Sequence, residues 1–301
     1  MKSRSMAVGL WIVMALSLVA AAGCVDADGG TGEERPVASA GGGTVGEEAG
    51  DAQAAPAAGA INIAGGTAHI PVMTEVQKRF AATHPAVKIS VAGGGSGVGI
   101  KQVGEGLVEI GNSGRTPTDE EIETYGLVLH RWAVDGVAVV VHPDNPVGDL
   151  SAEQLVRIFA GEITDWQAVG GPAHAIDVYT RDEESGTRKV FVDKALGKGA
   201  ITGGANVVVS NGAMKSAVAQ DPYSIGYVSV GHIDETVGPV ALDGVAPTLE
   251  NVKSGVYPVA RGLYSLTKGE PQGVVAEFIA YLYTAEGQEI ITAAGFIPVS
   301  E

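Results

Sequence analysis

Short apolar runs alternate with amphipathic runs along the chain from about residue 61 onward. INIAGG and KISVAGG are apolar runs that end in glycine, and the stretch between them places Met73, Val76 and Phe80 on one helical face. Strands that alternate with helices are typical of an α/β fold with a mostly parallel sheet, which binds ligands at the carboxyl ends of its strands. We therefore predict an α/β protein with its binding site at one edge of the sheet.

A similar junction occurs four times, where a predicted strand gives way to Gly, Ser or Thr near a predicted helix start. The four junctions are INIAGGTAHI, ISVAGGGSGVGIKQV, VEIGNSGRTPTDEEI and IDVYTRDEESGTRKVF. The first turn of a helix leaves backbone N–H groups unpaired, and the helix dipole makes that end mildly positive. Glycine lets an anion approach this backbone, and a hydroxyl adds a further donor. One Ser or Thr at such a place is more often a helix cap, but four converging junctions predict an oxyanion site.

Arg181 is the cation that the fourth junction adds to this predicted site. It precedes the Ser-Gly-Thr sequence of residues 185–187 by four positions. Its planar guanidinium can donate to two oxygens of one anion, and the two hydroxyls that follow can donate to others. The alternative role for this arginine is a surface ion pair with Asp182 or Glu183.

The N-terminal region has the pattern of an exported protein. Residues 1–23 contain Lys2 and Arg4, then an uncharged, mostly apolar run that ends in small residues, which is typical of a signal peptide. Cys24 is the only cysteine and stands where a bacterial lipoprotein carries its acylated cysteine; a plain export signal with an incidental thiol is the alternative. Residues 24–60 are rich in Gly, Ala and acids and are predicted to form a disordered tether. We expect an exported protein, lipid-anchored to the cell membrane and facing the periplasm or the cell exterior.

Composition excludes several classes of function. The formal net charge of −16 disfavours nucleic acids and anionic membrane surfaces as partners held by bulk electrostatics, although a small anion can still bind through local donors. The six histidines are scattered without metal-ligand spacing, so no metal or other cofactor is predicted. Ser96 lies in Gly-Gly-Ser-Gly rather than in the G-x-S-x-G elbow of a hydrolase. No enzymatic activity is predicted.

Seven motifs together resemble a known family. In chain order they are GGTAHIPV, GGGSGVGIKQV, IGNSGR, RDEESGTRKVF, SIGYVSV, YPVARGLYSLTKGEP and YLYTAEGQEIITAAGFIPV. They are similar to the substrate-binding proteins of phosphate ABC transporters, a family of periplasmic and lipoprotein phosphate-binding proteins. The resemblance spans roughly residues 61–300, and the combination of motifs is more specific than any one of them.

The resemblance implies a type II periplasmic-binding-protein fold, with two α/β lobes and a ligand cleft between them. Lobe 1 is expected to contain residues 61–135 and 239–301, and lobe 2 residues 136–238. The two crossings between the lobes are expected near WAVDGVAVVV and near HIDETVGPVAL. Closure of the lobes over the ligand is expected to create the form that the transporter recognises.

The resemblance also implies a set of ligand-binding residues. They are Thr67, Ala68, Ser96, Ser113, Arg115, Arg181, Glu183, Ser185, Gly186 and Thr187. Glu183 is expected to orient Arg181, and His69 is expected at most to border the ligand. One position departs from some relatives, which carry an aspartate that accepts the proton of hydrogen phosphate where this chain has Gly114. Discrimination against sulfate must then come from Glu183 or a backbone carbonyl, or be weaker.

The expected function is high-affinity binding of inorganic phosphate outside the cytoplasmic membrane and its delivery to the permease of an ABC transporter. We expect a monomer that is held at the membrane through Cys24. A binding protein for sulfate, molybdate or a phosphonate is one alternative. An interaction or adhesion lipoprotein that keeps only the fold is another, although the presence of Arg181, Ser185 and Thr187 speaks against it.

Overall fold

The structure is a computed structural model that describes residues 59–300. The predicted signal of residues 1–23, Cys24 and all but the last two residues of the predicted tether lie outside the described residues, so these features stay predictions. Between residues 59 and 300, no helix is long and apolar enough to cross a membrane. Within the same range, no group of three or more His, Cys, Asp or Glu side chains could hold a metal ion.

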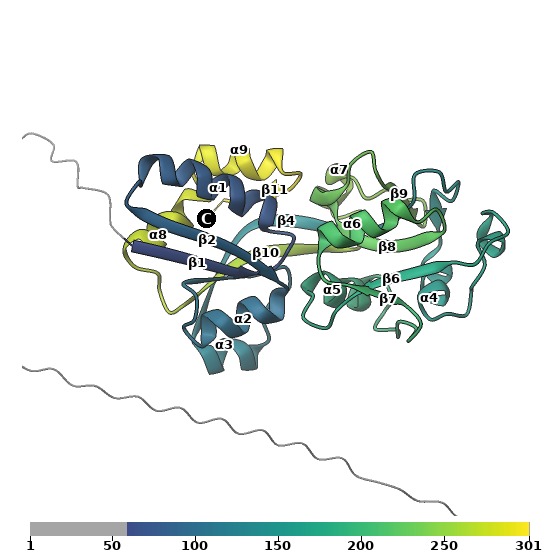
Figure 1. The fold of residues 1–301 in the computed structure, drawn as a ribbon, viewed down its shortest axis with the longest axis horizontal. Helices are drawn as coiled ribbons and strands as arrows, with labels where there is room; N and C mark the ends of the chain where they lie inside the picture. The colour runs from purple at the N-terminus through teal and green to yellow at the C-terminus, as the bar shows by residue number, and fades with distance from the viewer. Residues whose placement is uncertain (1–58, 301) are drawn as a thin grey trace, which may run out of the picture. The chain divides into compact units, whose positions relative to one another are not determined.

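A parallel three-stranded unit forms the first part of the sheet (Figure 1). It contains β1 (Gly59–Gly65), β2 (Val87–Gly94) and β3 (Ile110–Ser113), with β1 in the middle. The antiparallel strand β10 (Ala260–Lys268) joins β3 to the long strand β4 (Leu127–Val141). Parallel strands end at the same edge, so the loops after β1, β2 and β3 lie close together.

Helices cover both faces of this first lobe. They are α1 (Ile70–Thr83), α2 (Ser96–Gly104), α3 (Asp119–Tyr125), α8 (Gly273–Tyr281) and α9 (Ala285–Ala293), and the short strand β11 (Ile297–Pro298) pairs with β4. Figure 1 shows α1, α8 and α9 on one side of β1 and β2, and α2 and α3 on the other. The helical face predicted for α1 is buried, because Met73, Val76 and Phe80 pack against the same core as Ile61 and Ile63.

The second lobe continues the sheet from the C-terminal half of β4. Its strands are β5 (Asp149–Leu150), β6 (Asp177–Arg181), β7 (Asn206–Val208), β8 (Ser224–Ser229) and β9 (Gly238–Leu242). Its helices are α4 (Ala152–Phe159), α5 (Gly186–Lys194), α6 (Asn211–Gln220) and α7 (Leu249–Lys253), with 3₁₀ turns at Trp166–Val169 and Val230–His232. The parallel strands β6 and β7 end beside the start of α5 and α6, which repeats the arrangement of the first lobe (Figure 1).

The long strand β4 pairs with β10 through residues 127–136 and with β8 through residues 137–141, in the stretch where the first crossing was predicted. The second crossing was predicted near HIDETVGPVAL. There β9 pairs with β4 and β5 and buries Val240 and Leu242 in the core of the second lobe. Val252, Tyr257 and Val259 belong to that core as well. We therefore propose that the second crossing lies in β10, which would move residues 239–259 from lobe 1 to lobe 2.

Candidate anion-binding site

A small cavity lies where the loops of the two lobes meet, with room of only about 10 Å³ for a water-sized molecule. Its lining residues are Gly66, Thr67, Ala68, Gly95, Ser96, Gly114, Arg181, Ser185, Gly186, Thr187 and Arg261. All four predicted junctions contribute to it, and seven of the ten predicted ligand-binding residues line it. The other three, Ser113, Arg115 and Glu183, lie nearby but outside the lining.

The junctions of the first lobe bring backbone groups close to the cavity through glycine. Gly65 has a φ of 126°, and a Cβ at this residue would lie 2.3 Å from the carbonyl oxygen of Asn112. Gly95 has a φ of 94° and is followed by Ser96, the first residue of α2. The hydroxyl of Ser96 accepts a hydrogen bond of 2.9 Å from the backbone N–H of Gly114, which ties the second junction to the third.

Arg181 is held rigidly at the end of β6. Its Nε donates to the carbonyl oxygen of Val208 at 3.1 Å, and its Nη2 donates to that of Val209 at 3.1 Å. Its backbone N–H donates to the hydroxyl of Tyr227 at 3.0 Å. Burial lowers the pKa of Arg181, but the ordinary value is so high that the side chain stays cationic at neutral pH. Among residues 59–300, the buried Nη1 has no hydrogen-bond partner, so one edge of a fixed cation remains free.

Helix α5 begins beside Arg181 and adds donors. Ser185 is its N-cap, and the Ser185 hydroxyl accepts from the backbone N–H of Arg188 at 3.1 Å. The backbone N–H groups of Gly186 and Thr187, in the first turn, lie where no intrahelical acceptor exists. A negative ligand at this end is also stabilised by the helix dipole.

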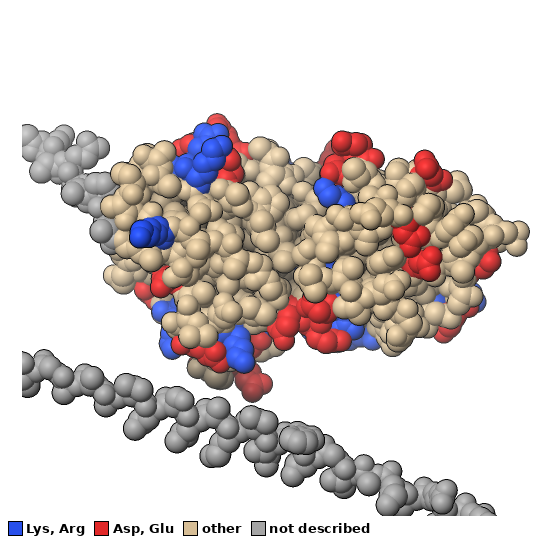
Figure 2. Space-filling model, viewed as in Figure 1, with Lys and Arg blue, Asp and Glu red and all other residues tan. Residues whose placement is uncertain are grey.

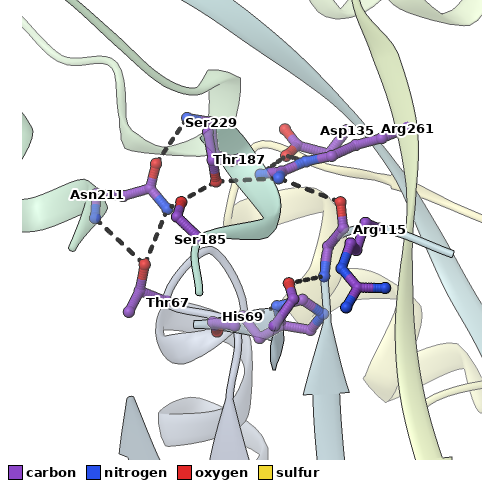
Figure 3. A network of polar contacts seen from close by, with 12 residues as sticks. Thr67, His69, Arg115, Asp135, Ser185, Thr187, Asn211, Ser229 and Arg261 are labelled. Carbon is purple, nitrogen blue, oxygen red and sulfur yellow. Dashed lines mark hydrogen bonds and ion pairs between the residues drawn. The ribbon is translucent and has the colours of Figure 1, made fainter. Parts of the chain in front are cut away.

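A second buried arginine, Arg261 on β10, lines the cavity and was not predicted from the sequence. Its Nε donates to the carboxylate of Asp135 at 2.8 Å, and its Nη1 donates to the hydroxyl of Thr187 at 3.0 Å and to the carbonyl of Gly114 at 3.3 Å (Figure 3). A Cβ at Gly114 would lie 2.8 Å from this Nη1, so the guanidinium fills the space beside Gly114. The available signal was Asp135 itself, a lone acid in the apolar stretch WAVDGVAVVV, since a buried carboxylate needs a partner.

Asn211, the first residue of α6, links the lobes and was also not predicted. Its side-chain Nδ2 donates to the hydroxyls of Thr67 at 3.1 Å and Thr187 at 3.5 Å, and its backbone N–H donates to that of Thr67 at 3.2 Å (Figure 3). Its Oδ1 accepts from the backbone N–H of Ser229 at 3.0 Å. Because Thr67 belongs to the first lobe and Asn211 to the second, these bonds hold the lobes together in the closed arrangement.

Arg115 follows the third junction but turns away from the cavity. Its Nη1 and Nη2 each donate to a carboxylate oxygen of Glu121 at 2.7 Å. Glu121 is itself fixed by a capping box with Thr118 at the start of α3. Ser113 is buried and donates to the backbone carbonyl of Arg115 at 2.7 Å, so it supports this loop instead of facing the cavity.

Glu183 does not contact Arg181, although the resemblance implied that it orients this arginine. Its side chain is 82% exposed and forms an ion pair with Arg188, one turn into α5. The carbonyl oxygens of Val208 and Val209 orient Arg181 instead.

His69 lies behind the cavity rather than in its lining. The ring is fully buried, its Nδ1 lies 3.1 Å from the carbonyl oxygen of Gly66, and Trp132 packs edge-on at 5.4 Å between ring centroids. Burial, aided by the positive charge of Arg261, lowers the pKa of His69 to about 3. The imidazole is therefore neutral at physiological pH and adds no charge to the site.

Replacing His69 by glutamine is expected to weaken the acid sensitivity of the fold. In the unfolded chain this residue takes up a proton near pH 6.5, whereas in the folded chain it does so only near pH 3. The free energy of unfolding therefore falls as the pH drops through this window, by about 1.4 kcal/mol per pH unit from this residue. Between pH 7 and pH 5, the free energy of unfolding measured with urea should fall by about 2 kcal/mol less in the variant than in the unmodified chain. His174→Gln, a surface control, should leave the loss unchanged; an equal loss in all three proteins would contradict the prediction.

Gly186→Ala is expected to raise the Kd for the ligand about tenfold by keeping the lobes from closing. A Cβ at Gly186 would lie 2.0 Å from the hydroxyl oxygen of Ser96 on the opposite lobe. Gly212→Ala is a matched control at the start of α6, because the nearest atom there is the Ser210 hydroxyl at 3.9 Å. Calorimetric titration of both variants checks this, and equal affinities would show that the lobes approach less closely than the structure indicates.

Comparisons with known proteins agree on one group of relatives. A family model described as PBP superfamily domain matches residues 50–286. The phosphate-binding protein PstS of Bacillus subtilis (strain 168) is 38% identical over 81% of this chain and 82% of its own length. The crystal structure of a substrate-binding protein assigned to a phosphate ABC transporter of Clostridium perfringens, with bound phosphate, is 34% identical. It matches 80% of this chain and all of its own with a TM-score of 0.76. An ABC-type phosphate transport receptor from Vibrio cholerae is 32% identical over 79% of this chain and 99% of its own, with a TM-score of 0.66.

Proposed function

We propose that this chain binds inorganic phosphate and delivers it to an ABC transporter permease. The chain belongs to the family of phosphate-binding proteins within the PBP superfamily. The fold is the type II periplasmic-binding-protein fold of that family. One observation carries the proposal most directly: a small cavity lined by two buried arginines and by hydroxyls from both lobes. Such a cavity satisfies a small multiply charged oxyanion and would be costly to keep for an apolar or cationic ligand.

The proposed ligand contacts come from both lobes. They are the side chains of Thr67, Ser96, Arg181, Ser185, Thr187 and Arg261 and the backbone N–H groups of Ala68 and Gly186. This set differs from the set implied by the resemblance, because it adds Arg261 and omits Ser113, Arg115 and Glu183, which do not line the cavity. Because neither lobe supplies a complete shell of donors, binding favours the closed arrangement, and this coupling gives the permease a state that reports occupancy.

Attraction of the ligand depends on the buried cations rather than on a basic surface. Figure 2 shows acidic and basic side chains spread over both lobes on the face in view, without a single large basic patch. The formal net charge is −16. Buried donors are also less screened by salt than surface charges, so affinity should depend only weakly on ionic strength.

The location and assembly that we propose follow from the N-terminal pattern. Export by the signal of residues 1–23 and acylation of Cys24 would tether the binding unit at the outer side of the cytoplasmic membrane, where a permease can reach it. A monomer is the proposed state for delivery, since the permease must contact both lobes of one molecule.

Isothermal titration of the full chain in detergent, stripped of bound ligand and shown to be folded, tests the proposal. Phosphate at neutral pH is expected to bind one to one with a Kd on the order of 1 µM or lower. Absence of heat and of thermal stabilisation by phosphate would reject phosphate as the ligand. A mass shift of the purified membrane form, matched to lipid on Cys24, tests the anchor separately.

A further inference from the structure

The threonine hydroxyls at the cavity can only donate hydrogen bonds to a ligand, because their oxygens already accept from other groups. A hydroxyl has one proton and two lone pairs. The oxygen of Thr67 already accepts from the backbone and from the side chain of Asn211, at 3.2 and 3.1 Å. That of Thr187 already accepts from Arg261 at 3.0 Å and from Asn211 at 3.5 Å. With both lone pairs used, each hydroxyl has only its proton left to offer.

The serines and arginines at the cavity also donate hydrogen bonds more readily than they accept them. The oxygen of Ser96 accepts from the backbone of Gly114 at 2.9 Å, and that of Ser185 accepts as an N-cap at 3.1 Å. Within residues 59–300, Arg181 Nη1 has no hydrogen-bond partner, and Arg261 Nη2 lies 2.7 Å from Asp135 without a well-directed hydrogen bond. The side chains at the cavity therefore present a shell of donors in which at most one lone pair remains on each serine.

Carboxylates in the described part of the chain stay outside this shell. None of the residues that line the cavity is acidic. Asp135 lies on the side of Arg261 remote from Thr67 (Figure 3) and uses one oxygen to bind that arginine. Glu121 is bound to Arg115, and Glu183 points to solvent with Arg188. Asp135 Oδ1 and Asp182 Oδ1 are buried without a hydrogen-bond partner, but neither residue lines the cavity, so no ionised acceptor forms part of its wall.

We propose that this site selects tetrahedral dianions by charge and size and does not reject sulfate, so that sulfate competes with phosphate. The inference rests on the proposed function. Hydrogen phosphate carries a proton that needs an acceptor, whereas sulfate carries none. A buried acceptor would face a sulfate oxygen without a proton between them, which is the costly arrangement that produces discrimination. A shell of donors imposes no such cost on sulfate, and it leaves the proton of hydrogen phosphate only a spare serine lone pair.

The small size of the cavity limits this class to inorganic anions. The room it leaves for a water-sized molecule is only about 10 Å³, far below the range of pockets that hold organic ligands. The backbone N–H of Gly97 on one lobe donates to the carbonyl of Glu184 on the other at 3.0 Å, which closes the wall at this side. An organic substituent, as in a phosphonate, would have to separate these lobes.

Calorimetric competition on the full chain tests the inference. Phosphate is titrated into ligand-free protein, then sulfate alone, then phosphate in the presence of sulfate. A Kd for sulfate within about 100-fold of that for phosphate is expected, because a site with a dedicated hydrogen-bond partner rejects the wrong analogue by about 10⁴-fold or more. Phosphate binding that is untouched by a 10⁴-fold excess of sulfate overturns the inference and leaves the proposed function intact. Failure of phosphate itself to bind overturns the proposed function.

A designed acceptor gives an independent check. Gly114→Asp would place a carboxylate beside Arg261, whose guanidinium has to shift to admit the new side chain and can then pair with it. The ratio of the sulfate Kd to the phosphate Kd is expected to rise at least about tenfold in this variant, and to change little in the matched Gly114→Asn variant, whose amide can also donate. An unchanged ratio in a Gly114→Asp protein that still binds phosphate counts against the inference. If this variant does not bind phosphate, the competition on the unmodified chain decides alone.

Discussion

Arg181→Ala is expected to raise the Kd for phosphate by about 10²- to 10³-fold. The loss is large because the guanidinium is buried, cationic and held by the Val208 and Val209 carbonyls with one edge free for the ligand. Removal of one partner from a buried, hydrogen-bonded charge pair typically costs about 2–5 kcal/mol, and each 1.4 kcal/mol corresponds to a factor of ten in Kd. Isothermal titration of the variant with phosphate measures the change directly.

Two controls separate a direct contact from damage to the fold. Arg181→Lys keeps the charge but cannot reproduce the planar fork, so it should recover part of the affinity and not all of it. Arg188→Ala removes a neighbouring, partly buried cation that pairs with Glu183 and does not line the cavity, and it should change the Kd by less than about threefold. If Arg181→Ala binds phosphate as the unmodified chain does, this arginine is not a ligand contact.

Arg261→Met is expected to lower the free energy of unfolding by about 3–5 kcal/mol and also to weaken phosphate binding. Asp135 is fully buried and has Arg261 as its ion-pair partner, so the substitution leaves an uncompensated charge in the interior. Burial already raises the pKa of Asp135 above its usual value, although Arg261 opposes this rise. Without the arginine the pKa rises further, and the folded state retains a proton that the unfolded state releases. Stability should therefore fall as the pH increases, and the loss should be larger at pH 8 than at pH 5.

The double variant Asp135→Asn with Arg261→Met separates stability from binding. With both charges removed, most of the lost stability should return, because a buried ion pair contributes little net stability compared with neutral residues of similar size. Phosphate affinity should stay low, since the second cation at the cavity is still missing. Urea unfolding and calorimetry on the single and double variants provide both readings. Full recovery of affinity in the double variant would show that Arg261 acts only as the partner of Asp135.

Local motifs were sufficient to predict the part of the site that lies within single junctions. Arg181, Ser185 and Thr187 belong to one strand-to-helix turn, and their spacing places them at the start of one helix whatever surrounds it. The capping-box pattern Thr118-x-x-Glu121 was also present in the sequence and indicates that Glu121 faces back toward the backbone of Thr118. The pairing of Glu121 with Arg115 is seen only in the structure.

Contacts between distant segments were beyond sequence reasoning. Arg261 and Asp135 are 126 positions apart, and Asn211 and Thr67 are 144 apart. Side-chain alternation indicates which face of a strand is buried, but the strand register that brings two residues together depends on the pairing of β4 with β10. The same pairing is the basis of our proposal that the second crossing lies in β10 rather than near residue 239.

The sequence by itself determined the α/β architecture, the helix starts that face the ligand, and the family. These features depend on periodicity and on turn chemistry, which act over a few residues. Tertiary structure alone decided which cations enter the cavity and which way its hydroxyls are polarised. A hydroxyl becomes a donor when other groups fill its lone pairs. Those groups belong to Asn211 and Arg261, which are distant in sequence from the hydroxyls that they contact. Selectivity is therefore set by packing between the lobes, because only packing fixes which polar atoms remain unpaired.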